Sequence, residues 1–403
     1  MVAVALISLA AGFGQFGAVA ALGSVARTFG HLSHGATIAD QAGLSGTVIA
    51  AGLAIFRLAS LGSLPLSGLA DRFGRRRVTL TTCALGLALT VLAAASPGYW
   101  WFVAIFALGR PLLSTTVGLA QVMVAELTDS ADRARAIAMV AAGYGVGAGL
   151  ITVLHSLAGG TLGFRGVFVL SLVPLALLPV LARRLVEPER FASVTSAEHQ
   201  RPVLGPVGRA YRGRLTVVCA VALAVSVITG PANSLIYLYA QNVRHVSGLV
   251  VSAMVVAAGF TGLAGLLAGR WLADRVGRRP TVAVAMVAMA GCGVLAYSGS
   301  LPALIGGYVL AVLAGSVFAP AGGALANELF PTAVRASVTG WTIAAGVVGA
   351  VIGLVLFGAV ADVGDRFSLA AVVTFLPAVP VAALLWLVPE TKGLEPEQLW
   401  APG

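Results

Sequence analysis

Apolar residues fill long stretches of this chain, and short polar stretches interrupt them at regular intervals. Each apolar run has about 20 residues, the length at which an α-helix crosses the hydrocarbon core of a bilayer. The pattern therefore predicts an all-α membrane protein with twelve transmembrane helices. We expect them at residues 2–28, 44–69, 78–97, 100–125, 134–158, 166–187, 215–240, 248–272, 281–300, 302–327, 336–361 and 367–388.

The connections between the runs are short, except for residues 183–214, which are polar, basic and proline-containing. Six runs lie on each side of this stretch. We therefore predict two six-helix bundles with a linker and a short tail, at residues 1–187, 188–214 (linker), 215–390 and 391–403 (tail). The first run has no basic segment before it and is too long for a signal peptide, so the first helix is expected to begin close to Met1.

Composition agrees with a membrane protein, because only 10% of the residues are charged and 59% are hydrophobic. The formal charge of +10 could indicate a nucleic-acid partner. That partner is excluded because the arginines lie in short loops between apolar runs and form no single basic face. No spacing typical of a disulfide, metal or phosphate-binding loop is present, so we expect no cofactor, no metal and no enzymatic activity.

The basic residues also predict the orientation. With the amino terminus in the cytoplasm, nineteen of the twenty-five Lys and Arg residues lie in inner loops and four in outer loops. This asymmetry follows the positive-inside rule and places both termini in the cytoplasm. Arginine almost completely replaces lysine, and alanine and glycine abound, which indicates GC-rich coding and a bacterial inner membrane.

The two halves share features at a nearly constant separation of about 200 residues. The repeated pairs are Gly68 and Gly269, Asp71 and Asp274, Glu126 and Glu328, and Glu189 and Glu390. A repeated unit of six helices keeps the same orientation in both copies. The halves are therefore predicted to be related by an axis along the membrane normal.

Three motifs resemble those of the major facilitator superfamily. "GLADRFGRRR" (68–77) and "GRWLADRVGRR" (269–279) are similar to its doubled loop signature, and "ELFPTAVRASVTG" (328–340) is similar to its segment after helix 10. "PETKGLEPEQL" (389–399) resembles the tail of sugar porters and organic-ion transporters. The resemblance covers the whole chain and implies two bundles around a central cavity that opens alternately to each side. It does not identify a substrate.

The resemblance also implies gating residues at the inner ends of the helices. Asp71 would contact helix 11 across the bundle interface and lock the cytoplasmic side, while Gly68 and Gly74 would permit a close approach and a tight turn. The full set of candidate gating residues is Asp71, Arg72, Gly68, Gly74, Arg75, Glu126, Arg133, Asp274, Arg275, Glu328 and Arg335.

Two arginines lie inside predicted helices. At ~1.5 Å per residue, Arg57 and Arg110 lie about 21 Å and about 24 Å from the inner ends of helices 2 and 4. All 15 acidic residues lie in loops or at helix ends, so neither arginine has a carboxylate partner at that depth. We interpret this pair as a site for an anionic substrate, such as a carboxylate held by two hydrogen bonds. The alternative is that they bind backbone carbonyls or water.

Gln15, Asn233, Tyr237 and Tyr144 are further candidates for contact with substrate. The sequence thus predicts a secondary transporter of a small organic solute, with an organic anion as the expected substrate. It is expected to act as a monomer and to have membrane lipid as its other partner. A broad-specificity drug or metabolite exporter, a sugar porter and a non-transporting sensor on the same scaffold remain as alternatives.

Overall fold

The computed structural model describes residues 1–31, 43–128, 133–187, 208, 211–364 and 366–393, and the structural statements below concern these residues. Their regular secondary structure is helical. Twelve segments are long and apolar enough to cross a membrane, from Val2–Ala20 to Phe367–Leu387. The predicted all-α fold with twelve spans is therefore confirmed.

The first half of the chain supplies six spans, some of which are built from more than one helix. Its elements are α1 (Val2–Ala20), α2 (Leu22–Phe29), α4 (Gly46–Ala59), η1 (Ser60–Gly62), α5 (Ser63–Phe73), α6 (Arg75–Ala93), α7 (Tyr99–Leu127), α8 (Arg133–Val169) and α9 (Leu172–Arg184). The long α8 belongs to two spans, because Gly163 has non-helical backbone angles, φ 60° and ψ −172°.

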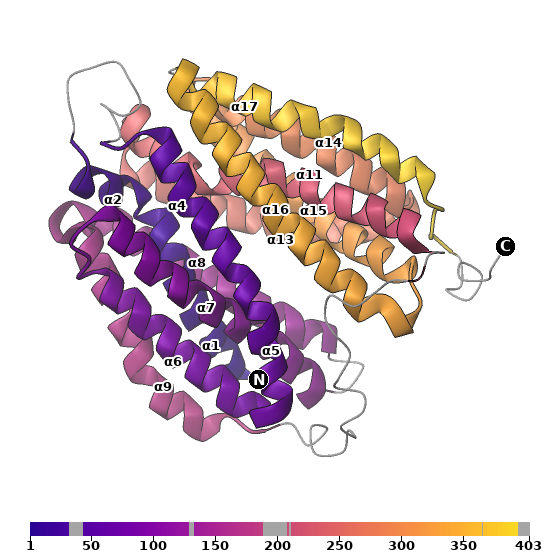
Figure 1. Ribbon diagram of the computed structural model, residues 1–403, viewed down its shortest axis with the longest axis horizontal. Helices are drawn as coiled ribbons and strands as arrows, with labels where there is room; N and C mark the ends of the chain where they lie inside the picture. Colours follow the sequence, from indigo (N-terminus) through magenta and orange to yellow (C-terminus); the bar gives the residue numbers. More distant parts are fainter. Residues whose placement is uncertain (32–42, 129–132, 188–207, 209–210, 365, 394–403) are drawn as a thin grey trace.

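The second half supplies the other six spans. Its elements are α11 (Arg212–Ser234), α12 (Ile236–Leu238), η4 (Tyr239–Val243), α13 (Gly248–Arg275), α14 (Arg278–Ala296), α15 (Leu301–Glu328), α16 (Thr332–Gly364), α17 (Phe367–Phe375) and η5 (Leu376–Leu387). Figure 1 shows the helices of the first half, in indigo to pink, on one side of the molecule and those of the second half, mostly in orange to yellow, on the other.

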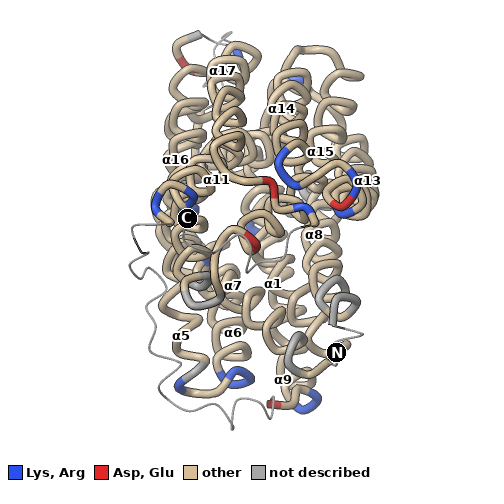
Figure 2. The backbone as a smooth tube through the Cα atoms, turned by 90° about the vertical axis from the view of Figure 1, so that its right-hand side faces the viewer, with Lys and Arg blue, Asp and Glu red and all other residues tan. Residues whose placement is uncertain are grey.

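Charged residues lie mainly at the ends of these helices, as Figure 2 shows along the tube through the backbone. We call the end of the molecule where α5 and α13 finish and α6 and α14 begin the basic end, because it carries Arg72, Arg75–Arg77, Arg275, Arg278 and Arg279. The other end is called the opposite end. The spans themselves are apolar, as a bilayer requires.

In each half, the helices of the first and fifth spans pack through glycine onto backbone. A Cβ atom at Gly147 of α8 would lie 2.0 Å from the carbonyl oxygen of Leu9 in α1, and one at Gly349 of α16 would lie 2.2 Å from that of Leu223 in α11. Small residues allow such close approach, which strengthens van der Waals packing between membrane helices. The pairs occupy corresponding spans, so the internal repeat extends to the packing of the helices.

This packing predicts a sharp difference between neighbouring glycines. Gly147→Ala should destabilise the protein by about 1–3 kcal/mol, because the added methyl group meets backbone that has no room to move. Gly149→Ala is the matched control, since nothing lies within 4 Å of its added Cβ. The melting temperature in detergent should fall clearly for Gly147→Ala and stay level or rise for Gly149→Ala. Equal melting temperatures for the two variants would contradict the close-packing argument.

Candidate functional site

A carboxylate holds the turn at the basic end of the second half. Glu390 accepts hydrogen bonds from the backbone N–H groups of Arg278 (2.9 Å) and Arg279 (3.0 Å) in the first turn of α14. It also accepts from the N–H groups of Thr391 (3.0 Å) and Lys392 (3.1 Å). Partial burial raises the pKa of Glu390, but these four backbone donors lower it more, and the net pKa lies below the ordinary value. The carboxylate thus caps α14 in its charged form.

Glu187 caps α6 in the first half, where its carboxylate accepts hydrogen bonds from the backbone N–H groups of Arg75 (2.6 Å) and Arg76 (3.0 Å). The predicted repeat of Glu390 with Glu189 is therefore wrong, and Glu187 is its structural counterpart. The segment "EPER" offers two glutamates two residues apart, and only the reach of the side chain to the helix start distinguishes them. Glu189 itself lies outside the described residues.

A second cluster joins the predicted gating residues of the second half. Arg278 forms ion pairs with Asp274 (3.1 Å) and Glu328 (3.3 Å), and the hydroxyl group of Thr391 donates to Glu328. Asp274 and Glu328 thus meet in one network that ties α13, α14 and α15 to the chain after η5. These contacts join residues of the second half, so they stabilise that half as a unit.

The remaining gating candidates are placed only in part. Gly74 has a φ of 93°, which suits the predicted tight turn, while a Cβ at Gly68 would meet nothing within 4 Å. The guanidinium groups of Arg72 and Arg275 lie over the rings of Phe73 (5.4 Å) and Trp271 (5.0 Å). The side chains outside the described set are those of Asp71, Glu126, Arg133 and Arg335.

Hydrogen bonds between the two halves gather at the opposite end. The carboxylate of Asp362 in α16 accepts from the backbone N–H groups of Gly46 (2.6 Å) and Thr47 (2.8 Å), the first residues of α4, and from the Thr47 hydroxyl group. Arg27 also donates to the side-chain oxygen of Asn242 at 2.7 Å. We call these contacts the latch. A carboxylate at the start of a helix also interacts favourably with the helix dipole.

A cavity of about 240 Å³ lies between the two halves, near the middle of the spans. Arg57, in the last turn of α4, and Ser60, in the 3₁₀ turn that follows, line it from the first half. The residues from α11 and α16 that line it are Ser226, Thr229, Gly230, Ile343, Gly346, Val347 and Ala350. No hydrogen bond or ion pair joins the Arg57 guanidinium to any residue that the structure describes. Arg57 thus lines a cavity between the halves, and its role as a substrate-binding residue stays a prediction.

Arg110 differs from Arg57, although their charges lie within electrostatic range of each other. Its guanidinium donates to the backbone oxygen of Gln15 (3.3 Å), and the Tyr144 hydroxyl group donates to the side-chain oxygen of Gln15 (3.3 Å). The structure thus brings three predicted site residues together, but none of them lines the cavity of Arg57. For Arg110, the structure therefore shows the alternative in which the guanidinium binds a backbone carbonyl.

Tyr237 and Asn233, the other two residues predicted to contact substrate, do not line the cavity of Arg57. Tyr237 is 1% exposed, and its ring meets that of Phe16 edge-on at 5.9 Å, so it packs the two halves together and does not line the cavity. Its hydroxyl group lies 3.5 Å from that of Tyr308. Asn233 lines a neighbouring cavity of about 280 Å³, which shares Thr229 with the cavity of Arg57.

Sequence reasoning missed the hydroxyl groups around Arg57. Ser226 and Thr229 lie three residues apart on α11, and Asn233 lies four residues further on, so all three share one face of that helix. This spacing was a usable signal. Ser60 offered no signal, because the 3₁₀ turn that aims it at the cavity is not evident from the residues.

A family profile described as Major Facilitator Superfamily matches residues 4–272 and 254–401. The chain belongs to the major facilitator superfamily. This membership makes it an integral, multi-pass membrane transporter of small molecules and not an enzyme. The resemblance read from the two loop motifs is confirmed.

Two relatives share about a quarter of their residues with this major facilitator protein. One, from Haemophilus influenzae, is named "Putative metabolite transport protein"; it is 26% identical over 353 residues, which cover 83% of this chain and 85% of the relative. The other, from Cupriavidus pinatubonensis, is named "Probable 4-methylmuconolactone transporter"; it is 25% identical over 349 residues, which cover 82% and 79%.

Solved structures of the superfamily share the fold. The E. coli xylose transporter XylE in its inward-open conformation superposes with a TM-score of 0.78 at 17% identity, covering 99% of this chain and 98% of that one. A bacterial homologue of the human lysosomal transporter Spinster, in an inward-facing and occupied conformation, superposes with a TM-score of 0.74 at 15% identity, covering 100% and 98%.

The cap at Glu390 predicts a pH-dependent contribution to stability. Because its folded-state pKa is lowered, the contribution is complete above the unfolded value of about 4.3 and is lost as the pH falls through the folded pKa. Glu390→Gln should therefore lower the melting temperature at pH 7, at a cost of about 1 kcal/mol. The difference from wild type should shrink below about pH 4. A difference that stays constant from pH 7 to pH 3.5 would show that charge is not what caps α14.

The latch predicts a shift in conformation when Asp362 is neutralised. Asp362→Asn should weaken the closed opposite end by about 1.5 kcal/mol, which raises the population open at that end about tenfold. Spin labels at Thr28 and Leu301, on different halves, would report this as a larger fraction of long distances. Asp274→Asn is the control, because that carboxylate pairs within the second half. Identical distance distributions for the two variants would rule out the latch.

Proposed function

We propose that this protein is a secondary transporter that carries a small organic anion across the membrane by alternating access. The observation that supports it most directly is the position of Arg57. Its guanidinium lines a cavity between the two halves and has no partner among the described residues. A cation at that depth is costly unless an anion or a set of hydrogen-bond acceptors compensates it.

A carboxylate fits this cavity in both charge and geometry. A guanidinium offers two parallel N–H donors that match the two oxygens of a carboxylate. The hydroxyl groups of Ser226 and Thr229 line the same cavity and can donate further hydrogen bonds to the bound group. The Ser60 hydroxyl group also lines it but donates to the backbone oxygen of Arg57. The bound anion would thus contact both halves at once, which is the geometry that alternating access requires of a substrate site.

The conformation of the molecule, closed at the opposite end, supports an inward-facing state. The latch holds the opposite end together, and two solved structures with the same fold are described as inward-open and inward-facing. The excess of arginine at the basic end supports placing that end in the cytoplasm of a bacterial cell. We propose that Asp71, Glu126, Arg133 and Arg335 lock the basic end in the other state, with the capped turns as rigid supports.

The alternatives have less support. The likeness to a xylose transporter, at 17% identity, is a likeness of fold and does not extend to the substrate. The curated relatives are named for metabolites, one of them for 4-methylmuconolactone, which favours a small metabolite over a broad range of drugs. A cationic drug would also meet the charge of Arg57 with no carboxylate beside it.

Substrate charge is the property that tests this proposal. Arg57→Ala should weaken the uptake or counterflow of the preferred acid in proteoliposomes about tenfold to over a hundredfold, because a charge-assisted hydrogen bond contributes about 1.5–3 kcal/mol. Arg57→Lys should restore only part of this, since an ammonium group keeps the charge but lacks the planar pair of donors.

Arg165→Ala is the matched control, because that exposed arginine binds the backbone oxygen of Ser96 near the opposite end. It should transport the acid like wild type. A neutral or cationic substrate whose apparent affinity is the same in wild type and Arg57→Ala would refute the assignment of an anion.

A further inference from the structure

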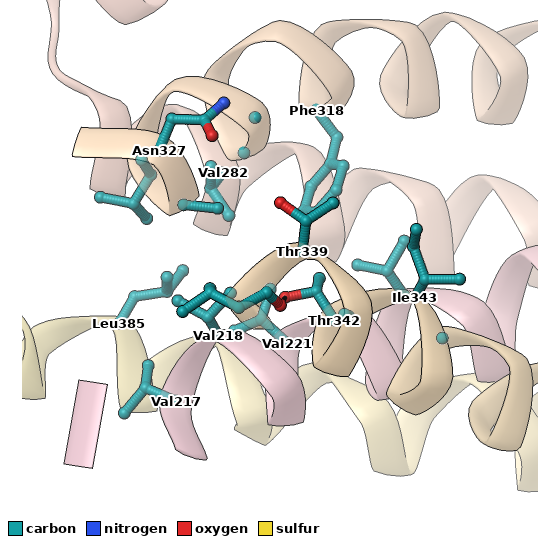
Figure 3. Close-up of a pocket in the computed structure, with 18 of the residues that line it drawn as sticks. Val217, Val218, Val221, Val282, Phe318, Asn327, Thr339, Thr342, Ile343 and Leu385 are labelled. Carbon is teal, nitrogen blue, oxygen red and sulfur yellow. Dashed lines mark hydrogen bonds between the residues drawn. The ribbon is translucent and has the colours of Figure 1, made fainter. Parts of the chain in front are cut away.

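A larger cavity, of about 420 Å³, lies in the second half beside the cavity of Arg57. Its walls come mainly from α11, α15 and α16. Figure 3 shows Val218 and Val221 on α11 and Thr342 and Ile343 on α16 around the same space, with Phe318 close by. We call it the apolar chamber.

The lining of this chamber is mostly apolar and carries no charged side chain. Four valines of α11 line it together with Phe318, Ile343 and Leu385, and the polar residues that line it are Ser226, Asn327, Thr339 and Thr342. No Asp, Glu, Lys, Arg or His is among the residues described as its lining. Such a chamber favours apolar groups and penalises a buried charge that has no partner.

The chamber and the cavity of Arg57 adjoin each other. Ser226, Ile343 and Gly346 line both of them. The combined site therefore has a single guanidinium and several hydroxyl groups at one end and apolar side chains at the other. Arg110 adds no second cation to the lining, because it is bonded to the backbone of Gln15 outside both cavities.

We infer that the substrate is an amphipathic monocarboxylate, with its carboxylate on Arg57 and its apolar body in the apolar chamber. This inference rests on the proposed function and adds the shape and polarity of the anion. A dicarboxylate of the same length would place its second charge among valines, at a large desolvation cost. A sugar would place its hydroxyl groups against a lining that is mostly apolar, which disfavours it relative to an apolar body.

Gly346 controls the junction between the two cavities. A Cβ at this position would lie 3.1 Å from the hydroxyl oxygen of Ser226, so a larger side chain narrows the passage while Ser226 can rotate to accommodate it. Ile343 lines the same junction and is 44% exposed, so a larger residue there should not disturb the helix packing. These two positions should determine which apolar bodies can enter.

The test measures binding of acetate, butanoate, hexanoate, adipate and hexan-1-ol to the purified protein by calorimetry. Each added methylene group of the monocarboxylates should tighten binding about fourfold, the value for moving a CH₂ group out of water. Adipate has the length of hexanoate with a second charge, and hexan-1-ol has its body without the charge. Both should bind about thirtyfold more weakly than hexanoate, or worse.

Two kinds of variant distinguish binding of the carboxylate group from binding of the apolar body. Arg57→Ala should weaken acetate, butanoate and hexanoate by a similar factor. Gly346→Val should instead reduce the rise of affinity with chain length, so that the affinity for hexanoate falls about tenfold or more relative to that for acetate. Ile343→Trp should flatten it in the same way and serves if Gly346→Val does not fold. Gly291→Val is the matched control, because a Cβ at Gly291 meets nothing within 4 Å and that residue lines neither cavity.

Each contrary result points to a different error. Binding that depends on Arg57 but does not rise with chain length, or adipate that binds as tightly as hexanoate, would overturn this inference and leave the proposed function standing. Acid binding unaffected by Arg57→Ala would overturn the proposed function. A rise with chain length that persists in both Gly346→Val and Ile343→Trp would place the apolar body elsewhere. A phospholipid that copurifies with wild type but not with Ile343→Trp, together with a flat series, would make the chamber a lipid site.

Discussion

A guanidinium deep in the membrane without a carboxylate beside it is the feature on which the functional interpretation of this protein depends. Twelve apolar helices can satisfy their own backbone and pack together without any charge in the interior. Arg57 is therefore not needed to build the scaffold. Its free energy cost calls for a compensating group, and under the proposed function that group is the bound anion, which would touch both halves.

The scaffold and the site differ in symmetry, and this separates architecture from specificity. The glutamate caps on α6 and α14 and the glycine contacts of α8 and α16 occur at corresponding places in the two halves. Arg57 and Arg110 have no arginine counterpart in the sequence of the other half. The repeated features stabilise each bundle, while under the proposed function the unrepeated arginine and the chamber beside it determine the specificity.

Much of the fold could be predicted from the sequence, because the length and hydropathy of a membrane span are set by the bilayer and not by neighbouring helices. The depth of Arg57 followed from counting residues along one helix. The role of Arg110 could not be obtained in this way, because the acceptor is a backbone oxygen on α1, and every residue has one. Tyr237 and Glu187 also required the structure, since a tyrosine packs or lines a cavity according to the rotation of its helix, and only the fold brings Glu187 to the start of α6.

The latch also makes the apparent affinity for solute differ between the two faces of the membrane. Its main acceptor is the carboxylate of Asp362, and two of the donors to it are backbone N–H groups at Gly46 and Thr47, which remain whatever side chains stand there. The strength of this contact sets the fraction of molecules that can receive a solute from the opposite side. The apparent dissociation constant on that side is the intrinsic constant divided by this fraction. A strong latch therefore makes the protein less sensitive to dilute solute on one face than on the other, even though a single site serves both.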